Sequence, residues 1–265
     1  DAAGPYVYPR EAFGEAVGFQ TAWGYWIAAW IGNAAIVTGT VAYLAEIVPA
    51  IKQTVGGPAI ASCAILWILA FLNWRGVRQM GFVQIITTVL KVMPLLAIVV
   101  LAIVLLGKGD ASVIRVDPQP LSLAAVTASA TLTLWAFLGL ESATVPAGSV
   151  IDPEKTIPRA TIWGTAITTA LYILACSTVV LLLPAATLAQ SSAPFADVIR
   201  MFWGGNAAAL LALFAFISGF GALNGWILVA AEMPATLARA GVLPKLFARQ
   251  SKYQTPGTSL FITNG

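Results

Sequence analysis

Residues 127–150 read TASATLTLWAFLGLESATVPAGSV, and this stretch indicates the class of protein to which the chain belongs. The run is about as long as a helix needs to cross a bilayer. It contains one carboxylate, Glu141, and no basic residue occurs between Arg115 and Lys155. A carboxylate at mid-membrane costs at least about 2.5 kcal/mol, so it rarely persists without a partner or a watery cavity. With Gly139 and Pro146 nearby, Glu141 predicts a helix that breaks near the bilayer centre and presents a site for something small crossing the membrane.

The composition of the whole chain agrees with a polytopic membrane protein. Apolar residues make up 59% of the 265 residues and charged residues only 9%, whereas a soluble domain carries about 25% charged residues. The net charge of +3 is too small and too dispersed to indicate nucleic-acid binding. The chain has no His, and Cys63 and Cys176 lie in apolar segments. We therefore predict no metal site, disulfide or cofactor.

Six apolar segments are long enough to span a bilayer, which predicts an all-α transmembrane bundle. They cover about 17–48, 58–74, 82–107, 127–150, 157–183 and 206–236. Residues 1–16 are predicted as a cytoplasmic loop or amphipathic helix, 237–257 as a cytoplasmic loop, and 258–265 as the start of another span. Because the chain begins without Met and ends in an apolar stretch, we expect residues 1–265 to be a single membrane-domain fragment of a longer protein.

The distribution of basic residues predicts the orientation of these spans. A cytoplasmic N-terminal stretch places nine basic residues in inner loops and four in outer loops, which fits the positive-inside rule. The inner set is Arg10, Arg75, Arg78, Lys155, Arg159, Arg239, Lys245, Arg249 and Lys252, and the outer set is Lys52, Lys108, Arg115 and Arg200. The outer connection that contains SAPFADVIRMFWGG is predicted to form a surface helix.

Lys91 lies nine residues into its span, roughly 14 Å deep at about 1.5 Å per residue. An ammonium at that depth cannot reach bulk water without a cavity. One interpretation is a structural ion pair with Glu141. The other is a group that gains and loses a proton as the protein cycles, because burial disfavours the charged form of a lysine.

Other unusual side chains lie near the centres of the spans. Asn33 has small neighbours that allow another backbone to approach, so it serves either an interhelical hydrogen bond or a ligand. Tyr25 lies eight residues earlier on the same helix face. Trp135 and Trp226 lie near mid-depth, although tryptophans normally prefer the interfaces. Packing and ligand contact both remain open for these two, since aromatic faces bind cations well.

Four stretches resemble the amino acid–polyamine–organocation transporters, and most closely their bacterial basic amino acid/polyamine antiporters. LWAFLGLESATVPAGSVIDPEKTIPRATIWG is similar to the sixth helix and the loop after it. GPYVYPREAFGEAVGFQTAWGYWIAAWIGNAA is similar to the third helix, and GALNGWILVAAEMPATLARAGVLPKLFARQSKYQTPG to the eighth. The stretch around Lys91 is similar to the fifth.

The resemblance implies a five-plus-five inverted-repeat fold, of which this chain holds helices three to eight and the start of nine. It also implies the site residues. The substrate-binding set would be Ala28, Ala29, Asn33, Ile36, Trp135, Leu138 and Trp226. Tyr25 and Glu141 would form a gate toward the cytoplasm. Lys91 is similar to the helix-five lysine of proton-coupled members, which favours proton coupling.

These observations predict a multi-pass inner-membrane transporter, not an enzyme, that moves amino acids by alternating access. Basic amino acids or polyamines are the expected substrates, by antiport or proton-coupled transport. A proton-coupled neutral amino acid permease and a non-transporting amino acid sensor remain as alternatives. An intramembrane enzyme would need a nucleophile–base pair or metal ligands at depth, and the chain has no His and Glu141 as its one clear deep carboxylate. A channel would need repeated rings of pore-lining groups, whereas the polar residues here converge on one level. The sequence leaves open whether the chain forms a homodimer.

Overall fold

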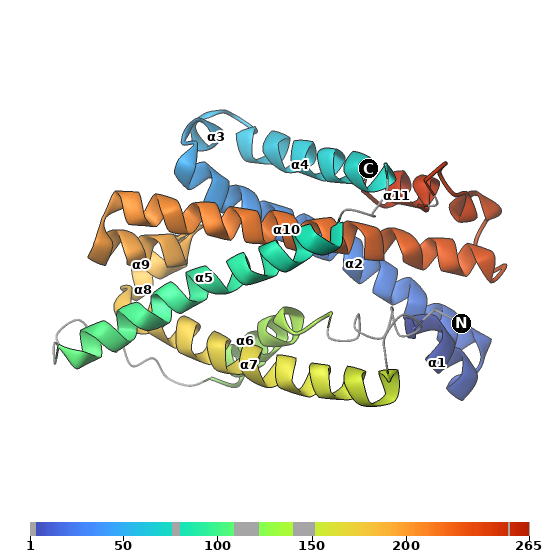
Figure 1. Cartoon of the computed structure of the whole chain (residues 1–265), viewed down its shortest axis with the longest axis horizontal. Helices are drawn as coiled ribbons and strands as arrows, with labels where there is room; N and C mark the ends of the chain where they lie inside the picture. Colours follow the sequence, from blue (N-terminus) through green and yellow to red (C-terminus); the bar gives the residue numbers. More distant parts are fainter. Residues whose placement is uncertain (1–3, 76–79, 109–121, 140–151, 254, 265) are drawn as a thin grey trace. The chain divides into compact units, whose positions relative to one another are not determined.

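The structure is a computed structural model and describes residues 4–75, 80–108, 122–139, 152–253 and 255–264. All regular elements in these ranges are helical. They are α1 (Gly4–Phe13), α2 (Glu15–Ile47), α3 (Ala50–Gln53), α4 (Gly57–Trp74), α5 (Met80–Gly107), α6 (Leu123–Ala136), α7 (Pro153–Leu182), α8 (Ala185–Gln190), α9 (Pro194–Trp203), α10 (Gly205–Arg239), the short 3₁₀ helix η4 (Lys245–Ala248) and α11 (Gly257–Asn264). Figure 1 shows their order along the chain.

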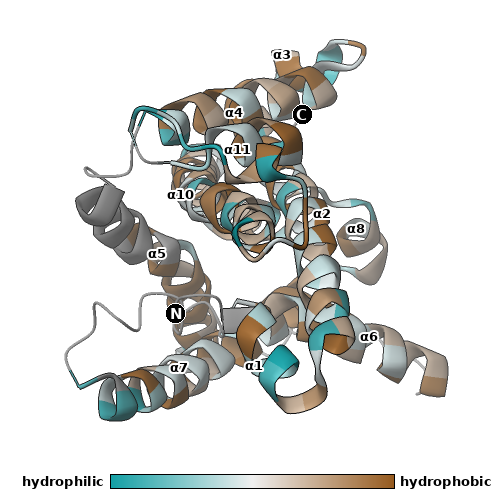
Figure 2. Ribbon diagram, turned by 90° about the vertical axis from the view of Figure 1, so that its right-hand side faces the viewer, coloured by the Kyte–Doolittle hydropathy of each residue, from teal (hydrophilic) through white to brown (hydrophobic). Residues whose placement is uncertain are grey.

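Four of the described helices, α2, α4, α7 and α10, are long and apolar enough to cross a membrane. Figure 2 shows apolar colours along the long helices and hydrophilic colours mainly at helix ends and connections. This pattern is that of an all-α, multi-pass membrane protein, because a helix satisfies its own backbone groups within the bilayer.

The described part of the predicted span over 127–150 is helical only as far as Ala136. α6 ends at Ala136 and is followed by a turn, in which the N–H groups of Phe137 and Leu138 donate to the carbonyls of Leu134 and Trp135. Gly139 then has φ 106°, a left-handed conformation that glycine adopts without a Cβ clash. The predicted helix over 127–150 is therefore interrupted after Ala136. Glu141, which the sequence places near the break, lies outside the described residues.

The described residues pack into two compact units. Unit 1 contains Gly4 and the described residues within 99–189, with the end of α5 and with α6 to α8. Unit 2 contains the described residues within 5–98 and 190–264. The prediction of a single membrane domain stays a prediction, and each unit is described by itself below.

The core of unit 2 lies among α2, α4, α10 and α11. α10 packs along α2 more extensively than any other described pair of helices does, and Figure 1 shows the two running in opposite directions. A cluster of buried apolar side chains joins the four helices. Its members are Val37, Val41, Ile65, Leu69, Ala70, Leu223, Ile227, Ala231 and Leu260.

Two contacts bring these helices close together. A Cβ added at Gly219 of α10 would lie 2.2 Å from Oγ1 of Thr40 of α2, so a larger residue there would force Thr40 or the helices to shift. Between α4 and α10, Nδ2 of Asn73 donates to Oδ1 of Asn224 at 2.8 Å, and both side chains are buried. Small residues and amide hydrogen bonds are the usual means by which membrane helices pack closely.

Candidate substrate site

The α2 residues expected to bind substrate differ in exposure. Ala29 and Asn33 are buried, Ile36 is half-buried against the unit 2 core, and Ala28 is exposed. The buried residues Ala29, Asn33 and Val37 follow one another at intervals of four, which places them on one face of the helix. Asn33 is therefore a polar side chain on the packed face of α2.

Asn33 is 2% exposed, and neither its Nδ2 nor its Oδ1 has a hydrogen-bond partner among the described residues. A buried amide without a partner costs roughly 1–3 kcal/mol, so such groups call for an explanation. The hydroxyl of Thr40, two turns away on the same helix, is already bonded to the carbonyl of Ile36 at 2.7 Å. Both Nδ2 and Oδ1 of Asn33 can therefore hydrogen-bond a group that is not among the described protein atoms.

Trp226 of α10 lies at the level of Asn33. The contact of Gly219 with Thr40 sets the register of this antiparallel pair. Trp226 is seven residues beyond Gly219, and Asn33 is seven residues before Thr40, so each lies about 10 Å from the contact in the same direction. Ala22 and Leu237 fit this register, since they share a second buried cluster and each lies eighteen residues from the contact. A half-buried indole and an amide that has no partner among the described residues therefore lie at one level of unit 2.

Tyr25, the predicted gate residue on α2, is half-buried and packs against this second cluster, which contains Tyr6, Ala22, Met233 and Leu237. It lies eight residues below Asn33 on α2, about 12 Å along the axis. The structure thus separates Tyr25 from the level of Asn33 and Trp226.

The two predicted site residues of unit 1 lie at the end of α6. Trp135 is in its last turn and 47% exposed, and Leu138 is in the following turn and 51% exposed. The ring of Phe137 between them contacts the ring of Tyr172 of α7, with centroids 5.7 Å apart. Trp135 and Leu138 belong to unit 1, whereas the predicted site residues of α2 and α10 belong to unit 2. Of the coupling residues, Glu141 and the side chain of Lys91, in α5, lie outside the described residues.

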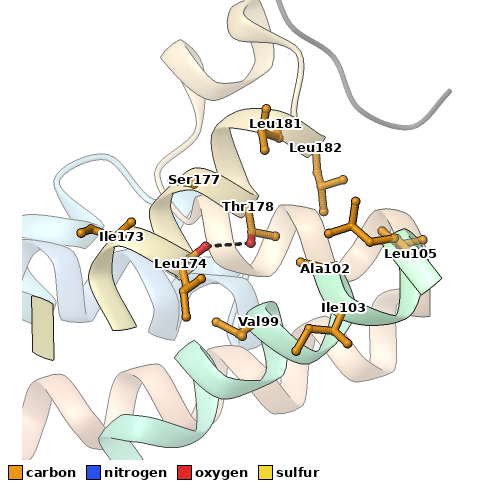
Figure 3. A pocket seen from close by; sticks show the side chains of 11 residues that line it. Val99, Ala102, Ile103, Leu105, Ile173, Leu174, Ser177, Thr178, Leu181 and Leu182 are labelled. Atoms are coloured by element: carbon orange, nitrogen blue, oxygen red, sulfur yellow. Dashed lines mark hydrogen bonds between the residues drawn. The ribbon is translucent and has the colours of Figure 1, made fainter. Parts of the chain in front are cut away.

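A cavity of about 300 Å³ lies in unit 1 between α5 and α7 (Figure 3). Its walls are apolar apart from Ser177 and Thr178, and the hydroxyl of Thr178 donates to the carbonyl of Leu174 at 2.8 Å. None of the lining side chains is charged. The cavity has no group that would hold an ammonium or a carboxylate, so we do not assign it to an amino acid substrate.

Sequence reasoning selected Asn33 but missed Asn73 and Asn224. Each of the three is an amide in an apolar helix, and that signal was available for all of them. In the structure Nδ2 of Asn73 bonds to Asn224 and to the carbonyl of Leu69 at 2.9 Å, so these two amides hold α4 against α10. Glu232 of α10 forms an ion pair with Arg239 of its own helix at 3.1 Å.

The fold and this site define a class: a multi-pass, all-helical membrane protein in which two long helices carry, at one level, an aromatic ring and a buried amide without a partner among the described residues. Comparison with known proteins identifies the family. The family model described as amino acid permease matches residues 1–265, so the chain belongs to the amino acid permease family.

Three relatives are all named as antiporters. The chain is 33% identical to a cadaverine/lysine antiporter of Escherichia coli K12, with 98% of the chain and 58% of the relative covered. It is 31% identical to an arginine/agmatine antiporter of Chlamydia abortus (98% and 56%) and 28% identical to an arginine/ornithine antiporter of Pseudomonas aeruginosa (98% and 55%). The chain thus spans a little over half the length of these relatives.

Proposed function

We propose that the full-length protein is a secondary active transporter of the bacterial inner membrane that exchanges basic amino acids or polyamines by alternating access. The observation that carries this proposal is the buried amide of Asn33, which has no partner among the described residues and lies level with Trp226. A bound amino acid or amine would supply the missing hydrogen bonds. The names of the three relatives support a cationic substrate.

The residues proposed to bind substrate belong to α2, α6 and α10. Asn33 hydrogen-bonds the substrate, while Ala28, Ala29 and Ile36 shape the α2 wall. Trp226 and Trp135, with Leu138, supply aromatic and apolar surface, and an indole face attracts a cation by up to about 2 kcal/mol when water is excluded. This division of roles suits a ligand with a charged end and an aliphatic stem.

The remaining roles concern gating and coupling. We place Tyr25 and Glu141 in a gate on the cytoplasmic side of the site, and we assign the proton-linked step to Lys91. In the corresponding fold, a five-plus-five inverted repeat, α2, α4, α5, α6, α7 and α10 would be helices three to eight and α11 the start of helix nine. The break after Ala136 supports a discontinuous sixth helix, because broken helices form the binding sites of such transporters.

Reconstitution of the full-length protein in liposomes tests the function. Vesicles loaded with arginine, lysine, ornithine, agmatine or cadaverine should take up labelled arginine or lysine faster than empty vesicles do. Uptake of neutral amino acids alone would instead assign a neutral permease. Binding of these compounds without flux would assign a sensor, and the absence of both binding and flux would refute the proposal.

The proton-linked role has its own test. Lys91→Ala should remove the dependence of transport on pH, because the titrating amine is lost. The neutral variant Lys91→Met should do the same, which separates loss of charge from loss of side-chain volume. An unchanged pH profile in both variants would contradict a role for Lys91 in coupling.

A further inference from the structure

A pocket of about 410 Å³ lies where the end of α4 meets the start of α11, and all of its walls belong to unit 2. Figure 1 shows α11 beside this end of α4. One part of the pocket is polar and contains Arg249, Ser251 and Thr258, and the other part is apolar and contains Trp74, Phe261 and Ile262. The pocket therefore offers a cationic group and an apolar wall side by side.

Aromatic rings surround this apolar wall. The ring of Phe261 stacks on that of Trp67 at 6.0 Å and lies 6.3 Å from that of Trp74, and Trp74 in turn meets Tyr253 edge to face at 6.0 Å. Trp and Tyr concentrate where a membrane protein crosses the headgroup level. Trp74 is the last residue of α4, a helix long and apolar enough to cross a membrane, and Tyr253 contacts its ring. We therefore expect the pocket at that level.

The charged side chains described in segments 57–75 and 239–264, which form the pocket, are all positive. Arg249 is exposed, Arg75 lies over the ring of Phe71 at 4.8 Å, and Lys252 lies over the ring of Tyr253 at 5.0 Å. None of these three forms an ion pair with a carboxylate of the described residues. Moreover, the segments 57–75 and 239–265 contain no Asp or Glu. An anion that approached this surface would meet cations that no neighbouring carboxylate of these segments neutralises.

The polar side of the pocket is held in place by hydrogen bonds. The hydroxyl of Thr255 donates to the carbonyl of Trp74 at 3.2 Å, and the N–H of Ser251 donates to the carbonyl of Thr255 at 2.8 Å. On α11, the hydroxyl of Ser259 donates to the carbonyl of Phe247 at 2.8 Å. These bonds tie the loop to the ends of both helices, so the pocket is formed before a ligand arrives.

We infer that this pocket binds the phosphate-bearing headgroup of an anionic phospholipid. The guanidinium of Arg249 contacts the phosphate, since its fork of N–H donors matches phosphate oxygens. Trp74, Phe261 and Ile262 pack against the glycerol and the first methylenes of the acyl chains. Charge complementarity and the apolar wall together select a lipid, because a free anion would use only the polar half. The leaflet follows from the orientation predicted by the basic residues, and the inference does not depend on transport.

Native mass spectrometry of the purified full-length protein in detergent tests this site. Phosphatidylglycerol should bind more tightly than phosphatidylcholine. Arg249→Gln should weaken the binding of phosphatidylglycerol about fivefold, the effect of one basic residue near an anionic membrane surface. Arg249→Lys, which keeps the charge, should retain part of the affinity. The matched control is Arg159→Gln, which removes an exposed arginine on the same predicted side but in α7.

Two results would overturn the inference. If Arg159→Gln weakens phosphatidylglycerol binding as much as Arg249→Gln does, the attraction is a diffuse effect of net charge. If inorganic phosphate at the concentration of the lipid displaces it, the site belongs to a soluble anion. Thermal unfolding of both variants controls for folding, and no transport substrate is present in any sample. Failure here therefore leaves the transport proposal unaffected.

Discussion

At the scale of single residues, Asn33 differs from the other buried amides described in unit 2 in its hydrogen bonding. Nδ2 of Asn73 donates to Oδ1 of Asn224 at 2.8 Å, which satisfies polar groups in an apolar surrounding. Asn33 is equally buried and has no partner among the described residues. An unpaired amide lowers stability, so its presence on the packed face of α2 is explained more directly by a ligand than by packing.

This contrast leads to opposite effects of two similar substitutions. Asn33→Ala should reduce exchange by about tenfold or more, because one or two hydrogen bonds to the substrate are lost. The same change should leave the thermal unfolding temperature unchanged or raised, since it removes a buried polar group that has no partner among the described residues. Asn73→Ala, by comparison, should lower the unfolding temperature, because it breaks the contact between α4 and α10. Liposome exchange and thermal unfolding of the full-length protein measure the two effects. If the Asn33→Ala variant exchanges substrate at the wild-type rate, Asn33 does not bind the substrate.

The contact between α2 and α10 depends, at the scale of elements, on the absence of a side chain at Gly219. A Cβ there would lie 2.2 Å from Oγ1 and 3.1 Å from Cβ of Thr40. Gly219→Ala should therefore destabilise the full-length protein by roughly 1–3 kcal/mol, as overpacking usually does. Gly225→Ala on the same helix is the control, because its Cβ would meet no described atom within 4 Å.

Rescue distinguishes the proposed clash from a general effect of helix glycines. Adding Thr40→Ala to Gly219→Ala removes the hydroxyl and the methyl group that crowd the new Cβ, so part of the lost stability should return. Thermal unfolding in detergent provides the measurement. Equal losses for Gly219→Ala and Gly225→Ala would argue against close packing at this point.

Arg200 links the surface helix α9 to the end of α2. It pairs with Asp197 of its own helix and with Glu46 of α2, and Lys52 of α3 also pairs with Glu46. The side chain of Glu46 is only 11% exposed, so this network is less screened than an isolated surface pair. The hydroxyl of Ser191 donates to Asp197 and extends the network to the chain before α9.

Arg200→Gln should loosen α9 and destabilise the protein by roughly 1 kcal/mol, because two carboxylates lose their shared cation. The difference from wild type should shrink as the salt concentration rises. Hydrogen exchange of α9 amides and thermal unfolding measure the effect. Lys245→Gln, which removes an exposed cation with no ion pair among the described residues, should leave both unchanged. If hydrogen exchange of the α9 amides is the same in Arg200→Gln as in wild type, apolar packing alone holds α9.

Orientation in the membrane is a prediction about the whole molecule. In a background of Cys63→Ser and Cys176→Ser, a membrane-impermeant maleimide should label Lys108→Cys in intact cells, because the basic residues place Lys108 outside. Lys245→Cys should react only after the cells are permeabilised. Both positions are exposed, so accessibility of the side chain does not limit the reaction. The reverse labelling pattern would invert the orientation and move the proposed lipid site to the outer leaflet.

Apolar runs of the sequence and described helices coincide where one helix fills one run. The span predicted over 17–48 corresponds to α2, Glu15–Ile47, and the span over 206–236 to α10, Gly205–Arg239. The run over 127–150 behaves differently, because α6 ends at Ala136. Apolar composition reports burial in the bilayer but not the local backbone turn, which here precedes the left-handed Gly139.

The sequence by itself determined that this is an all-helical membrane protein. The reason is that a long apolar segment can satisfy its backbone groups in a bilayer only as a helix. The tertiary structure alone decided which buried amide has no partner among the described residues. Asn33, Asn73 and Asn224 look alike in the sequence, and the partner of Asn73 lies 151 residues away. Pairing over that distance depends on how α4 packs against α10, and nothing in the local sequence of either helix specifies it.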